Sequence, residues 1–136
     1  EYGVTTGRPR RCGTLDLVAL RYACLANSID ALVLTHLDVY DTLDTFEACV
    51  AYNIRGSIVE HFPASVKDLA DARPVLRTFH GWNRSLKDVR SYEDLPMEAK
   101  DYISFIEEYT ETPVEMVSVG YDRRETIVRK SPWTRS

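Results

Sequence analysis

The chain has 136 residues, of which 44% are hydrophobic, and this size allows one modest core and suggests a single domain. Its formal net charge of −4 argues against a general nucleic-acid surface, because such a surface needs excess cations to displace counterions. No apolar run approaches the length of a membrane span, so no membrane partner is expected. Cys12, Cys24 and Cys49 form no C-x-x-C pair. This spacing argues against a zinc site or a disulfide framework and indicates a reducing, cytoplasmic compartment with Cys24 and Cys49 buried.

The first half of the chain alternates between helical and strand patterns. Apolar residues at roughly helical spacing predict a helix over 15–27, which Asn27-Ser28 would end. The continuous apolar run over 31–37 is typical of a buried strand in an α/β sheet. Segments 45–52 and 54–62 alternate in polarity around a turn, so they predict an antiparallel excursion.

The second half contains the clearest helical pattern, over 95–109, with Ser91 or Asp94 as its cap and Pro96 in its first turn. The other elements expected here are a helical turn and three strands, over 66–72, 74–79, 114–119 and 125–129. The whole pattern predicts an α/β fold: a mixed, mostly parallel sheet with flanking helices and an antiparallel excursion.

An arginine-rich string stands just ahead of the first predicted helix and reads Thr5-Thr6-Gly7-Arg8-Pro9-Arg10-Arg11-Cys12-Gly13. Two hydroxyls, a turn glycine and three arginines form a compact anion trap, because a guanidinium fork binds carboxylate or phosphate through two parallel hydrogen bonds. Backbone N–H groups at the helix start would strengthen the same field. The alternative is a solvated basic turn without a ligand.

Two further strings lie at the ends of predicted strands, where ligands of α/β sheets usually bind. The first reads Leu34-Thr35-His36-Leu37-Asp38-Val39 and the second Val117-Ser118-Val119-Gly120-Tyr121-Asp122-Arg123. In this order and at this spacing, the three strings resemble the adenylosuccinate synthetase family, which joins L-aspartate to IMP and uses GTP. The resemblance covers essentially the whole chain but only the last third of a family member.

The chain departs from the family pattern at notable positions in or beside each string. Thr14 stands where tryptophan is usual, His36 where lysine is usual, and Tyr121 where proline is usual. A histidine can stack on a purine but cannot span the distance that a lysine spans or hold a full charge at pH 7. We therefore expect altered nucleotide selectivity; the alternative is that His36 is an exposed loop residue without a role. Tyr121 would line the base pocket or simply cover the sheet.

The resemblance implies binding residues in two groups. Thr5, Thr6, Arg8 and Arg10 would bind aspartate and IMP, and Arg10 would also approach the GTP ribose. For the two threonines, the alternative is a role in hydrogen bonding at the helix entry. The members implied for the GTP site are Arg10, His36, Asp38, Ser118 and Gly120.

Asp38 has the most specific role in this reading. Guanine presents its N1–H and exocyclic amine side by side, so one carboxylate can accept from both. Adenine presents an acceptor at that place, and leaving a buried group unpaired costs about 1–3 kcal/mol. The alternative is an aspartate that caps the turn after its strand.

The chain contains no G-x-x-x-x-G-K-[ST] loop for nucleotide phosphates. The family's catalytic aspartate and histidine also have no counterpart, so neither a catalytic nor a metal-binding residue is assigned. We expect 1–136 to be a single C-terminal segment, inactive alone. The complete enzyme is expected to be a cytoplasmic homodimer that uses GTP and Mg²⁺. Two alternatives remain open: a diverged, non-catalytic module that binds a purine nucleotide or a protein, and an interaction domain whose motifs are relics.

Several conspicuous side chains are assigned structural roles only. His61 and His80 lie away from any motif, and Trp82 and Trp133 are expected to be packing anchors. The carboxylates expected to face solvent on the long helix are Asp101, Glu107 and Glu108.

Overall fold

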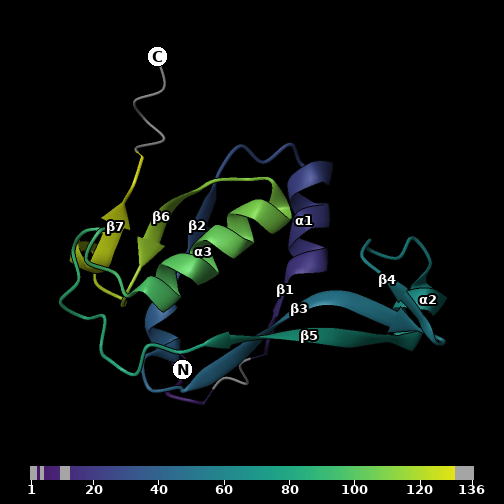
Figure 1. Cartoon of the computed structure of the whole chain (residues 1–136), viewed down its shortest axis with the longest axis horizontal. Coiled ribbons are helices and arrows are strands. Elements are labelled where there is room, and N and C mark those ends of the chain that lie inside the picture. The colour runs from purple at the N-terminus through teal and green to yellow at the C-terminus, as the bar shows by residue number, and fades with distance from the viewer. Residues whose placement is uncertain (1–2, 4, 10–12, 131–136) are drawn as a thin grey trace.

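The computed structural model describes residues 3, 5–9 and 13–130 (Figure 1). Arg10, Arg11, Cys12 and Trp133, which were singled out above, lie outside the described residues. The helices are α1 (Leu17–Ala26), α2 (Val66–Asp71) and α3 (Met97–Thr110), with 3₁₀ turns η1 (Leu37–Tyr40) and η2 (Arg123–Glu125). The strands are β1 (Leu15–Asp16), β2 (Leu32–Leu34), β3 (Thr45–Ile54), β4 (Ser57–Val59), β5 (Ala72–His80), β6 (Val114–Ser118) and β7 (Thr126–Val128).

The described strands form two mixed sheets. In one, β3 pairs in parallel with β1 and antiparallel with β4 and β5. In the other, β6 pairs in parallel with β2 and antiparallel with β7. Figure 1 shows β3 and β5 side by side along the lower part of the molecule, with α3 crossing between them and the second sheet.

The predicted α/β class is confirmed, but the expectation of one mostly parallel sheet differs from the structure. Antiparallel pairs outnumber the parallel pairs β1–β3 and β2–β6 among the described strands. The reason is β3, which is ten residues long and serves as the common partner of three other strands. A hydrophobic pattern identifies a strand but does not say which neighbour it selects.

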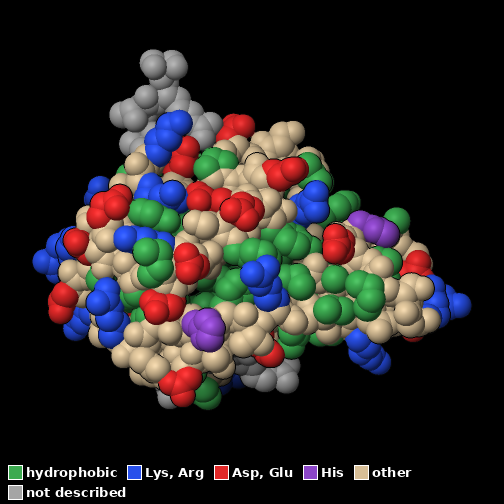
Figure 2. Space-filling model, in the orientation of Figure 1, with side chains coloured by type: hydrophobic (Ala, Val, Ile, Leu, Met, Phe, Trp, Pro, Cys, Tyr) green, Lys and Arg blue, Asp and Glu red, His purple; other side chains and the backbone are tan. Residues whose placement is uncertain are grey.

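The main core lies between the two sheets and is built around α3. Tyr102, Ile103 and Ile106 point inward from this helix and are almost fully buried. Tyr102 meets the ring of Phe46 from β3 edge-on at 4.8 Å and that of Phe79 from β5 at 5.0 Å. Figure 2 shows further apolar side chains gathered at the surface between α3 and β5. The same helix therefore holds both sheets in place.

Helix α1 runs over Leu17–Ala26, close to the predicted bounds, with Asp16 as its N-cap and Asn27 as its C-cap. The Asp16 carboxylate accepts the N–H of Ala19 at 3.0 Å and the hydroxyl proton of Tyr52 at 2.5 Å. Burial, followed by this hydrogen bond, raises the pKa of Tyr52 well above its usual value. Ser28 has a positive φ of 52° and turns the chain out of the helix. Asp16 thus fixes the helix start to the neighbouring sheet.

The cap predicted for α3 is wrong. Pro96 occupies the N-cap position and makes no side-chain capping bond. Ser91 and Asp94 hydrogen-bond to each other at 2.7 Å in the preceding turn. The proline fixes its own φ and so begins the helix without a capping side chain.

The expectation for Glu107 is also wrong, whereas Asp101 and Glu108 are exposed as predicted. Glu107 accepts the N–H of Val114 at 2.7 Å and an N–H of Arg129 at 2.6 Å. The carboxylate therefore ties α3 to the start of β6 and to the segment after β7. Helical spacing alone could not show this, because both partners come from later in the chain.

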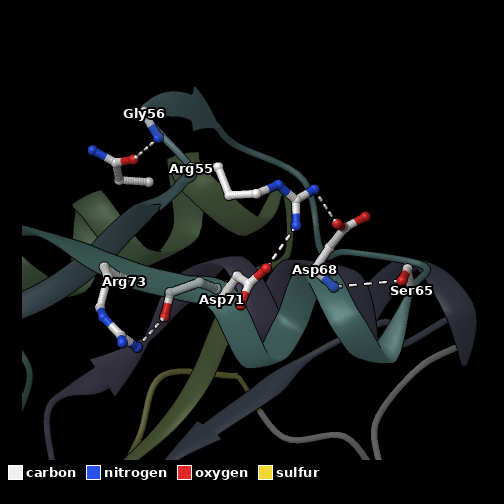
Figure 3. A network of polar contacts seen from close by, with 8 residues as sticks. Arg55, Gly56, Ser65, Asp68, Asp71 and Arg73 are labelled. Carbon is white, nitrogen blue, oxygen red and sulfur yellow. Dashed lines mark hydrogen bonds and ion pairs between the residues drawn. The ribbon is translucent and has the colours of Figure 1, made fainter.

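The far end of the first sheet is held by a polar clasp (Figure 3). Arg55 stands in the β3–β4 turn with a positive φ of 50° and pairs with Asp68 and, at 2.7 Å, with Asp71 of α2. Gly56 donates its N–H to the Asn53 side chain at 2.9 Å. These ion pairs are exposed, so each stabilises the fold only slightly. They nevertheless define how α2 packs against the hairpin.

The cysteine and tryptophan predictions that can be examined are confirmed: Cys24, Cys49 and Trp82 are buried. Trp82 donates its indole N–H to the Asp41 carboxylate at 2.9 Å, and the second oxygen of Asp41 accepts the Leu86 N–H at 2.9 Å. Asp41 therefore connects η1 to the loop before α3. None of the described helices is long and apolar enough to cross a membrane.

Replacing Asp41 with alanine should destabilise the fold, because two buried or partly buried donors lose their acceptor. We expect Asp41→Ala to lower the free energy of unfolding by about 1–3 kcal/mol in a chemical denaturation experiment. Asp44→Ala is the matched control, because the Asp44 side chain is exposed and, among the described residues, accepts a hydrogen bond from the exposed Asn83 amide alone. Equal losses in the two variants would contradict the role assigned to Asp41.

Candidate functional site

The second sheet brings two of the three motifs to one edge. β2 and β6 pair in parallel, with Leu34 opposite Val117, so their carboxyl ends lie together. The segment after β2 contains His36 and Asp38, and the end of β6 and the turn after it contain Ser118 and Gly120. This edge is where ligands of α/β sheets usually bind.

The first motif is shaped by a reversal of the backbone at His36. This residue has φ 55° and ψ 47°, in the left-handed region, where histidine is uncommon but tolerated. Leu37 is fully buried in the main core and anchors the turn that follows. Asp38 consequently lies in the first turn of η1, beside the sheet edge.

Ser118 joins the two motifs. Its hydroxyl oxygen accepts the backbone N–H of His36 at 3.2 Å and donates its proton to the carbonyl of Gly120 at 2.7 Å. One small side chain therefore sets the spacing between the His36 reversal and the Gly120 turn. All four residues predicted for the base pocket outside the arginine-rich string, His36, Asp38, Ser118 and Gly120, are brought together at this edge.

The Asp38 carboxylate has an oxygen that is buried and, among the described residues, lacks a hydrogen-bond donor. The nearest basic group is Nδ1 of His36, which lies 3.7 Å from the same Oδ1 atom. The side chain as a whole is 34% exposed, so another part of it is open to solvent while Oδ1 is not. A buried carboxylate oxygen without a donor is costly, and an N–H group of a ligand would satisfy it.

The turn after β6 is closed by a reciprocal pair of hydrogen bonds between Asp122 and Glu125 at η2. Hydrogen bonds from Arg124 to the Asp122 carboxylate hold the pKa of that group below its usual value. Tyr121, which stands between Gly120 and Asp122, is 95% exposed. Its ring therefore neither lines a base pocket nor covers the sheet.

Thr5, Thr6 and Arg8 lie in an exposed turn at the start of the chain. Gly7 has a positive φ of 61°, and two backbone bonds close the turn, Gly7 N–H to Gly3 O at 2.8 Å and Gly3 N–H to Arg8 O at 2.9 Å. Helix α1 is capped by Asp16 rather than by either threonine. Within the described segments, no hydrogen bond joins this turn to the edge formed by the other motifs. Arg10 lies outside them.

A cavity of about 330 Å³ extends between α1, α3 and β2. Its lining is mainly apolar and includes Leu20, Leu34, His36, Tyr40 and Tyr102, but neither Asp38 nor Ser118. The cavity thus adjoins the edge at His36, while Asp38 and Ser118 lie outside its lining. In the part of the chain that the structure describes, no three His, Cys, Asp or Glu side chains are placed to hold a metal ion.

Glu125 also lies beside this edge, although its place in the sequence indicated only the start of a strand. The signal was present, because an aspartate followed three positions later by a glutamate is the spacing of a capping box. The spacing from Asp122 to Glu125 could have identified the closed turn, although not its proximity to Gly120.

Three comparisons with known proteins agree on one family. The family model described as adenylosuccinate synthetase matches residues 1–127. The adenylosuccinate synthetase of Aquifex aeolicus (strain VF5) is 53% identical over 127 residues, which are 93% of this chain and 29% of that protein. That of Hydrogenobaculum sp. (strain Y04AAS1) is 51% identical over 127 residues, 93% of this chain and 30% of that protein.

A solved structure agrees with the sequences. The structure described as fully ligated adenylosuccinate synthetase from Plasmodium falciparum matches with a TM-score of 0.86 and 39% identity, over 96% of this chain and 32% of that one. The chain thus spans about 30% of the length of the curated relatives that it matches. On the family match, the identities and the shared fold, the chain belongs to the adenylosuccinate synthetase family.

Proposed function

We propose that this chain is the C-terminal third of a purine-biosynthesis ligase that forms adenylosuccinate from IMP and L-aspartate with hydrolysis of GTP. Family membership and the order of the three motifs support the proposal. The C-terminal placement rests on that motif order. The 136 residues then form one segment that carries an aspartate loop and a guanine pocket.

The guanine pocket is proposed at the shared edge of β2 and β6. Asp38 accepts the N1–H and the exocyclic amine of guanine, and Ser118 and Gly120 approach the guanine carbonyl. The single observation that carries this role is the Asp38 carboxylate, which has a buried oxygen without a donor among the described residues and a side chain that is 34% exposed. Adenine cannot provide the missing donors, so the pocket discriminates between the two purines.

His36 is proposed to contact the guanine base by stacking on it. Its ring lies 3.7 Å from the Asp38 carboxylate, close enough to compete for that group when the ring is protonated. This proximity is the observation that favours the alternative function, a diverged module that binds a purine nucleotide without catalysis. Both functions require the same guanine pocket. They differ in whether the chain acts as part of a catalytic ligase or binds the nucleotide without catalysis.

The arginine-rich turn is proposed as the site for aspartate and IMP. Thr5 and Thr6 supply hydroxyl donors, and Arg8 and Arg10 supply two cationic forks for a dicarboxylic acid. Arg8 also approaches IMP, and Arg10 approaches the GTP ribose. The exposure of Thr5, Thr6 and Arg8 leaves their side chains available to such ligands.

The remaining chemistry is assigned to parts of the complete enzyme other than this chain. Phosphoryl transfer depends on positioning and on neutralising charge around the phosphates. Among the described residues, no three His, Cys, Asp or Glu side chains are grouped to hold Mg²⁺. The complete enzyme is proposed to be a cytoplasmic homodimer that uses Mg²⁺ and does not bind nucleic acid.

The guanine pocket can be tested by amide NMR of the isotope-labelled chain titrated with GDP and, separately, ADP. Without phosphate contacts we expect weak binding, on the order of millimolar. GDP should shift amides near Asp38 and Ser118, and ADP should not. Asp38→Asn should abolish the preference, because the amide places a donor against the donors of guanine.

The control for this titration is Asp101→Asn, which makes the same chemical change on the exposed face of α3. It should leave the GDP shifts unchanged. A well-dispersed spectrum that neither nucleotide perturbs would refute the guanine pocket and favour a relic or an interaction domain.

The purified 136-residue chain should form no adenylosuccinate from IMP, L-aspartate, GTP and Mg²⁺, because it provides no phosphate-binding loop and no catalytic pair. A complete family member assayed in the same mixture is the positive control. The chain should be produced in a host that lacks its own enzyme. Product above the background of a mock purification would show that the chain is catalytically sufficient.

A further inference from the structure

We propose that Glu125 is a positioning residue for the guanine site, since its carboxylate holds the turn over 118–122 in the form that presents Ser118 and Gly120. This inference rests on the proposed function, because it concerns the same pocket. Glu125 is 8% exposed and stands at the end of η2, immediately before β7. It cannot contact a base itself while it is buried beneath the turn.

Glu125 closes the turn at both ends. Its Oε2 accepts the Asp122 N–H at 2.9 Å, and its backbone N–H donates to the Asp122 carbonyl at 2.9 Å. Its own carbonyl accepts the Val119 N–H at 2.8 Å. The next residue, Thr126, lies opposite Ser118 in the β6–β7 pair. One residue thus fixes the turn to the sheet on either side of Gly120.

Gly120 and Glu125 are also matched in space. A Cβ atom on residue 120 would lie 2.2 Å from Oε2 of Glu125 and 2.7 Å from its Cδ atom. The carboxylate therefore occupies the volume that any side chain at position 120 would need. The glycine here is required by this close approach and not by an unusual backbone angle.

The consequence reaches Asp38 through a continuous set of contacts. The Gly120 carbonyl, set by the carboxylate beneath it, accepts the Ser118 hydroxyl proton at 2.7 Å. The same hydroxyl accepts the His36 N–H at 3.2 Å, and His36 lies beside Asp38. Loss of the Glu125 carboxylate should therefore displace the Gly120 carbonyl. Through Ser118 it should also displace His36, which lies beside Asp38.

The test compares Glu125→Met with Glu125→Gln in the full 136-residue chain. Methionine fills a similar volume but cannot accept the Asp122 N–H, whereas glutamine keeps an acceptor oxygen at the same distance. GDP and ADP are titrated by amide NMR. Hydrogen exchange is measured without nucleotide at the Asp122 amide and at amides of α3, which report the stability of the core.

We expect Glu125→Met to reduce the GDP response at residues 36–38 about tenfold and to speed exchange at Asp122, with α3 exchange unchanged. Glu125→Gln should restore the GDP response to within about twofold of wild type. If Glu125 had only a structural role, its loss would change hydrogen exchange in α3 together with exchange at Asp122. The Glu125→Met and Glu125→Gln variants would then show the same preference between GDP and ADP.

Two results would overturn the inference: a wild-type GDP response in a folded Glu125→Met variant, or equal impairment by methionine and glutamine. If Glu125→Met does not fold, Asp122 exchange in Gly120→Ala decides, because the new methyl group must displace the carboxylate. Faster exchange at Asp122 with unchanged α3 exchange then supports the inference, and exchange at the wild-type rate opposes it.

If GDP shifts no amide of the wild-type chain, the guanine pocket is refuted but the anchoring of the turn by Glu125 is not. Hydrogen exchange at Asp122 still tests that anchoring. Faster exchange in Glu125→Met alone would support the anchor, and unchanged exchange would overturn it.

Discussion

The candidate site depends on the parallel pairing of β2 with β6. Because Leu34 lies opposite Val117, the two short strands end at the same edge, and the residues that follow them meet there. Ser118 then reaches the backbone of His36 across a separation of 82 residues. Without this register the carboxylate of Asp38 and the turn at Gly120 would belong to unrelated surfaces. The tight packing of Leu37 and Val117 in the core keeps the register in place.

Much of the local structure could be predicted from the sequence. The helix Leu17–Ala26, the strand Thr45–Ile54 and the long helix Met97–Thr110 correspond to the patterns predicted over 15–27, 45–52 and 95–109. The apolar pattern did not indicate which strand or side chain each element would pair with. β3 pairs with three strands, and Glu107 bonds to residues that follow it in the chain. Such choices depend on three-dimensional packing that no local window contains.

The site shows the same division. Short strings pointed to His36, Asp38, Ser118 and Gly120, and the structure places these four together at one edge, although their binding role stays a prediction. The sequence could not show that one Asp38 oxygen lacks a donor among the described residues, nor that Tyr121 is exposed to solvent. Both depend on burial, which is a property of the assembled fold. Glu125 was overlooked because its importance lies in the space beside Gly120 rather than in a recognisable motif.

The long separation between β2 and β6 has a further consequence for how the chain folds. The β3–β5 pair and the clasp at Arg55 close over short stretches of chain, whereas the edge at His36 and Ser118 must bring together residues 82 positions apart. Closing a longer loop costs more chain entropy, and contacts of high sequence separation slow folding. The ligand edge should therefore assemble after the β3–β5 ribbon has formed.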